Sequence, residues 1–245
     1  MARWSELLSP RRVAASARRL AALAWVDRRV KALVILLILG DLLAMLLHIG
    51  HRLNTHGIFA FDALLDPGFY MKYGSSYAAH YGFVMLGAIA LTSVWLFATS
   101  HQAVYAGIGL AFLTVLTNAV FGLHVIMGDW VDETLGLQAI YHEYANYVGE
   151  AISFAVIGCA AFAILLWTCE RSTLDHGIVG ILVALTLAAL SLFDGALDLA
   201  NALNLSKSDW LSETLVFIEE SGELLAITAT LVILTTVAIA QRADG

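Results

Sequence analysis

Six runs of apolar residues divide most of the chain, and each is long enough to cross a lipid bilayer. A helix rises about 1.5 Å per residue, so about 20 residues span the roughly 30 Å of hydrocarbon. Overall, 60% of the residues are hydrophobic and only 13% are charged, as expected of a chain whose main solvent is lipid. The sequence therefore predicts an all-α, polytopic membrane protein with a six-helix transmembrane bundle, its spans at 30–53, 76–99, 103–126, 137–168, 175–204 and 210–241.

The first 29 residues form a separate segment of different character. Arginine alternates there with leucine, alanine and tryptophan at helical spacing. Such a pattern is typical of an amphipathic helix that lies on an anionic membrane surface, although a basic tail that only fixes topology would look similar. The chain is thus divided into an interfacial segment, residues 1–29, and a transmembrane domain, residues 30–245.

Basic residues indicate how the spans are oriented, because cytoplasmic segments of membrane proteins are enriched in lysine and arginine. Ten of the 13 basic residues fall on one side of the expected membrane, in the amino-terminal segment, the fourth connection and the carboxyl-terminal tail. The other three are Arg52, Lys72 and Lys207. We therefore expect an integral protein of a bacterial inner membrane with both termini in the cytoplasm.

Polar side chains within the spans gather in the half of the membrane that this topology makes the outer half. They follow single helix faces: Glu143, Asn146 and Glu150 recur at helical spacing, as do Ser191, Asp194 and Asp198. Such stripes are expected to face the bundle interior. The candidate ligands of a site in this half are His48, His80, His124, His142, Glu150, Asp194, Asp198, Glu220 and Glu223.

Carboxylates inside a bilayer need compensation, because each costs about 2.5–3.5 kcal/mol at mid-membrane even on the lenient insertion scale. No lysine or arginine lies within a span, apart from Lys31 and Arg52 at the ends of the first. Three means of compensating the carboxylates remain: protonation, water in an outward-facing cavity, or bound cations. The accompanying histidines favour a metal, since imidazole together with carboxylate suits Fe, Cu, Zn or Mn. We expect one such ion, or two.

The sixth apolar run contains the most acidic residues close together, Glu219, Glu220 and Glu223, so it has the greatest need of such compensation. Glu220 and Glu223 are three residues apart and share a helix face, whereas Glu219 points about 100° away from Glu220. We therefore expect Glu220 and Glu223 to face the bundle core and Glu219 to have a structural role. The choice is close, because Glu219 is also one turn from Glu223.

Three functions are compatible with such a sequence. A metal-dependent membrane enzyme, either an oxidoreductase or a hydrolase, fits the one-sided placement of polar groups. The arrangement resembles, in principle only, helical bundles that hold two metal ions, but the paired Glu-x-x-His motifs of soluble di-iron bundles are absent. The alternatives are a cation or proton-coupled transporter that uses the same acids and a haem-b electron carrier. The expected partners are the lipid bilayer and either a second copy of the chain or another membrane subunit, with no nucleic acid.

Overall fold

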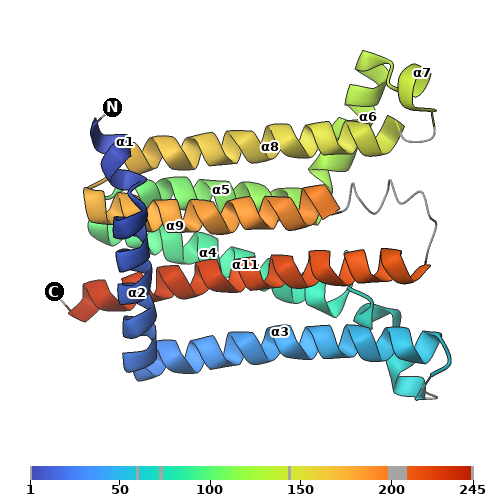
Figure 1. Ribbon diagram of the computed structural model, residues 1–245, viewed down its shortest axis with the longest axis horizontal. Helices are drawn as coiled ribbons and strands as arrows, with labels where there is room; N and C mark the ends of the chain where they lie inside the picture. Colours follow the sequence, from blue (N-terminus) through green and yellow to red (C-terminus); the bar gives the residue numbers. More distant parts are fainter. Residues whose placement is uncertain (1, 59–60, 72–73, 143–144, 198–208, 244–245) are drawn as a thin grey trace.

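The computed structural model describes residues 2–58, 61–71, 74–142, 145–197 and 209–243. Every regular element in these ranges is helical. Six of the helices are long and apolar enough to cross a membrane, so the predicted all-helical fold with six candidate spans is confirmed. Figure 1 shows these helices running along a common direction: α3 (Arg28–Thr55), α4 (Tyr77–Ser100), α5 (Ala103–Phe121), α8 (Ala145–Glu170), α9 (Leu174–Ser191) and α11 (Asp209–Ala243).

The amino-terminal segment lies across one end of this bundle. It contains a short helix, α1 (Ala2–Leu7), and an amphipathic helix, α2 (Pro10–Val26), which packs against α3, α9 and α11. In Figure 1, α2 crosses the ends of the long helices, and both chain termini lie at this same end. We call it the terminal end and the opposite one the distal end. The shorter elements at or toward the distal end are η1 (Asp62–Leu65), η2 (Pro67–Phe69), α6 (Leu123–Leu135), α7 (Gln138–Tyr141) and the π-helical turn η4 (Leu192–Leu197).

Helix α11 occupies a central position, because it packs against α3, α4 and α9. The main core forms where α4, α5, α8 and α9 meet, and it includes the fully buried side chains of Ile89, Tyr105, Phe112 and Leu165. Helix α3 lies at the edge, and residues such as Leu36 leave its outward face exposed and apolar. Such a face is suited equally to lipid and to a partner subunit.

Local capping interactions explain where several of the spans begin and end. Asp27 accepts hydrogen bonds from the backbone N–H groups of Arg29 and Val30, and so caps the start of α3. Ser76 caps α4 in the same way through the N–H of Ala79. Gly122 ends α5 with a positive φ of 61°, a conformation that glycine adopts without strain.

The structure corrects three of the predicted boundaries. The third span ends at Phe121 instead of 126, and residues 127–136, which lie between the third and fourth predicted spans, fall largely within α6. The fourth span begins at Ala145, because α7 and a residue with positive φ, His142, precede it. The fifth helix ends at Ser191 and continues as η4, and the remainder of the predicted span, from 198, lies outside the described residues.

Candidate functional site

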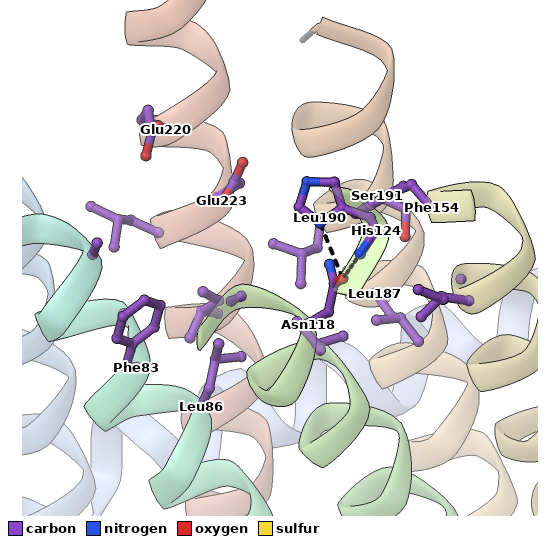
Figure 2. A pocket seen from close by; sticks show the side chains of 18 of the residues that line it. Phe83, Leu86, Asn118, His124, Phe154, Leu187, Leu190, Ser191, Glu220 and Glu223 are labelled. Carbon is purple, nitrogen blue, oxygen red and sulfur yellow. Dashed lines mark hydrogen bonds between the residues drawn. The ribbon is translucent and has the colours of Figure 1, made fainter. Parts of the chain in front are cut away.

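The largest concentration of predicted site residues surrounds a cavity of about 160 Å³ in the distal half of the bundle. Helices α4, α5, α6, α8, α9 and α11 all contribute to its wall. Most of the wall is apolar, and Phe83, Leu86 and Leu187 are representative (Figure 2). Its polar side chains are Asn118, His124, Ser191, Glu220 and Glu223.

The helix break at Gly122 places His124 in this wall. Because α5 stops there, the chain turns into α6 and brings His124 back toward the side chain of Asn118, which is buried. The Oδ1 atom of Asn118 accepts two hydrogen bonds from His124, one from its backbone N–H at 2.9 Å and one from its ring Nδ1 at 3.1 Å. One asparagine oxygen thus fixes both the turn and the orientation of the imidazole ring.

This arrangement also assigns the tautomer of neutral His124. The backbone N–H can only donate, so the atom that accepts it must be the asparagine oxygen and not the amide nitrogen. The same oxygen then requires that Nδ1 carry a hydrogen. In the neutral ring the other nitrogen, Nε2, therefore carries no hydrogen, and Figure 2 shows it directed away from Asn118. Histidines that bind metals are commonly held in this way, with one ring N–H donated to a neighbouring oxygen.

The carboxylates come from the opposite wall. Glu220 and Glu223 lie one turn apart on α11, and both are partly buried and line the cavity. Figure 2 shows both of them on the α11 side, across the cavity from His124. Glu219 does not line this cavity, and it is buried more deeply than either neighbour, with 7% of its surface exposed.

The other predicted ligands with described side chains lie elsewhere. His48 is buried between the rings of Tyr70 and Phe217, and its Nδ1 accepts the backbone N–H of Met71 at 3.1 Å. His80 is exposed, and its Nδ1 lies 2.7 Å from the carbonyl oxygen of Ser76, which accepts its hydrogen.

His142 and Glu150 are also outside the cavity wall. His142 is exposed between α7 and α8. Glu150 lies on α8, where its backbone packs closely against Gly128 of α6. Asp198 and the side chain of Asp194 lie outside the described residues. The structure thus brings together His124, Glu220 and Glu223 and separates them from His48, His80, His142 and Glu150.

Two polar residues in the cavity wall, Asn118 and Ser191, were not among the predicted ligands. Asn118 stands six residues before His124 in an otherwise apolar run, and only the glycine between them indicates that the two side chains can meet. Within the described part of the chain, no group of three or more His, Cys, Asp or Glu side chains is placed so that it could hold a metal ion. Comparison with protein-family models, with curated proteins and with solved structures finds no match to this chain.

Proposed function

We propose that this protein is a metal-dependent membrane enzyme whose site is the cavity between α6 and α11. In this proposal Glu220 and Glu223 supply carboxylate oxygens to the ion, and Nε2 of His124, on the opposite wall, reaches it through a water molecule. Water fills the remaining positions around a divalent ion. The observation that carries the proposal is the imidazole of His124, whose Nδ1 is held by Asn118 on one wall while two carboxylates line the other.

The size and chemistry of the cavity support this assignment. A volume of about 160 Å³ leaves room for an ion together with several water molecules. Catalytic metal sites keep positions open for water or substrate, whereas structural sites are closed by protein ligands. Imidazole with carboxylates suits zinc, iron, manganese or copper. Such ions catalyse hydrolysis through a metal-bound hydroxide, and the redox-active ones catalyse oxidation or reduction by changing their oxidation state.

Metal analysis of the purified protein tests the proposal. We expect about one metal ion per chain, and the optical spectrum separates zinc, which is colourless, from iron and copper. His124→Gln, Glu220→Gln and Glu223→Gln should each lower the metal content with the helical content unchanged. The matched controls are His80→Gln and Glu133→Gln, which alter exposed side chains outside the cavity. Full metal content in the three cavity variants would overturn the proposal.

A second function, ion or proton-coupled transport, is favoured by one observation. The buried carboxylate of Asp41, near the midpoint of α3, is bonded to Thr228 of α11, which directly follows the cavity-lining residue Ile227. A polar group at this depth is what a route through the bundle requires. Reconstituted protein that moves protons or divalent ions across liposomes, and does so less after Asp41→Ala, would favour transport over catalysis.

A further inference from the structure

A second, larger hollow lies at the terminal end, far from the cavity described above. It is a groove of about 490 Å³ between α2 and the ends of α9 and α11. Its polar wall includes Arg12, Ser16 and Arg19 of α2 and Asp175 and His176 of α9. Its apolar wall includes Leu20, Leu23, Ile178 and Val237. The groove therefore combines positively charged side chains with an apolar surface.

The two arginines share one face of α2. They are seven residues apart, with Ser16 between them at helical spacing, so all three point into the groove wall. Neither guanidinium forms an ion pair or hydrogen bond with the described residues. Arg11 and Arg18 lie on an adjacent face of the same helix and do not line the groove. The groove thus carries two cations that form no ion pair with a described side chain, and Asp175 is the one acidic residue in its wall.

His176 adds a hydrogen-bond donor to the same wall. Its Nδ1 lies 2.6 Å from the hydroxyl oxygen of Tyr105, which is completely buried. A buried hydroxyl needs an acceptor, and Nδ1 is the one that the structure provides. Neutral His176 therefore accepts at Nδ1 and carries its hydrogen on Nε2. The groove offers two guanidinium groups and an N–H donor to a bound anion.

We infer that this groove binds the phosphate headgroup of an anionic phospholipid. Arginine recognises phosphate through paired N–H donors, and basic pockets between membrane helices on the cytoplasmic side bind such headgroups. A lipid is favoured over a soluble phosphate because the groove is also lined by Leu20, Leu23 and Val237, on which acyl chains can lie. The position fits as well, since α2 packs against α3, α9 and α11, three of the helices that are long enough to span a bilayer.

Native mass spectrometry of the detergent-purified protein, titrated with phosphatidylglycerol or phosphatidylcholine, tests this inference. We expect the full chain to retain phosphatidylglycerol in preference to phosphatidylcholine. The double variant Arg12→Gln/Arg19→Gln should bind phosphatidylglycerol about tenfold more weakly or worse, since each basic residue near an anionic lipid contributes a several-fold effect. Glutamine and arginine have similar helix propensities, so α2 should persist, which circular dichroism checks.

The matched control is Arg11→Gln/Arg18→Gln, which removes the same charge from the same helix outside the groove. It should retain phosphatidylglycerol nearly as well as the unmodified protein. Asp175→Asn should strengthen retention, because it removes the negative charge from the groove wall. Equal losses in the two double variants, or equal retention of both lipids, would overturn the inference. Displacement of phosphatidylglycerol by inorganic phosphate at a similar concentration would show that the groove recognises phosphate alone and not lipid.

Discussion

The hydroxyl of Thr228 on α11 donates a hydrogen bond to the carboxylate of Asp41 on α3, with 2.8 Å between Oγ1 and Oδ2. Only 1% of the surface of Asp41 and 6% of that of Thr228 is exposed. Tyr81 of α4 reaches the same place, where its hydroxyl donates to the carbonyl oxygen of Leu37, one turn before Asp41. A polar cluster thus joins three helices at a depth where most neighbours are apolar.

We predict that Thr228→Val destabilises the protein by about 1 kcal/mol, the scale of a hydrogen bond between membrane helices. In an Asp41→Ala background the same substitution should cost much less, because the hydroxyl then keeps only its weak bond to the sulfur of Met85. Unfolding in detergent of the four proteins of this double-mutant cycle gives the coupling energy. The control is Thr114→Val, since the hydroxyl of Thr114 bonds within its own helix, to Leu110. Strictly additive effects would contradict the prediction.

The number and type of the spans could be predicted from the sequence because lipid imposes a simple requirement. A run of about 20 apolar residues has few alternatives to a helix when no water is present to satisfy the backbone. The same reasoning could not locate the end of the third span. Its apolar run continues past Gly122. The turn depends on Asn118, whose side-chain oxygen accepts a hydrogen bond from the backbone N–H of His124.

The candidate site was only partly predictable, for a related reason. Helical spacing identifies residues that share a face of one helix, and Glu220 and Glu223, which it placed on one face, both line the cavity. It does not indicate which faces of different helices meet. His48 is placed by the loop before α4, through Met71, and His80 turns its ring to its own helix backbone at Ser76. These contacts depend on tertiary packing, which a single sequence does not reveal.

Helices α6 and α8 should be sensitive to any side chain added at their closest contact. A Cβ atom at Gly128 would lie 2.7 Å from the backbone nitrogen of Glu150, and one at Gly149 would overlap the carbonyl oxygen of Gly128. We predict that Gly149→Ala destabilises the protein by about 1–3 kcal/mol, the usual cost of overpacking. Since α6 carries His124, metal content should fall as well. Thermal unfolding and metal analysis of the same sample provide the two measurements.

The control for this substitution is Gly87→Ala in α4. A Cβ atom at Gly87 would meet nothing within 4 Å, so this change should be neutral or slightly stabilising. Equal behaviour of the two alanine variants would show that the α6–α8 contact tolerates a side chain.

Asp66 should make the α3–α4 connection sensitive to acid. Its carboxylate accepts hydrogen bonds from the backbone N–H of Gly68 at 2.8 Å and from the hydroxyl of Tyr77 at 2.9 Å. These two bonds, the first being the stronger cause, lower the pKa of Asp66 below its usual value. A lowered folded-state pKa stabilises the fold above the unfolded value, about 3.9, and this stabilisation is lost as the pH falls through the folded pKa.

Asp66→Ala should therefore lower the thermal midpoint at neutral pH, and the difference from the unmodified protein should shrink as the pH falls below about 4. Thermal unfolding across this pH range provides the measurement. Asp62→Ala in the same connection is the control, because Asp62 makes no hydrogen bond with the described residues through its side chain. A constant difference between Asp66→Ala and the unmodified protein at every pH would contradict the prediction.

Metal addition should stabilise the protein through Glu220 and Glu223. A ligand that binds only the folded state raises the free energy of unfolding as its concentration rises. At a concentration of about 100 times its dissociation constant the increase is about 2.7 kcal/mol. Two carboxylates one turn apart in a mostly apolar wall provide the negative charge that a divalent ion requires. We therefore expect chelator-treated protein to unfold at a lower temperature and to recover when zinc, manganese or iron is returned. The ion that restores the largest increase identifies the preferred metal.

The same titration separates the three glutamates of α11. Glu220→Gln and Glu223→Gln keep the shape of the side chain and remove its charge, so the thermal increase on adding metal should be largely lost. Glu219→Gln should keep that increase, because Glu219 lies outside the cavity wall, although its burial predicts a lower midpoint with or without metal. If instead Glu219→Gln abolished the increase and Glu220→Gln preserved it, the metal would bind on the other face of α11.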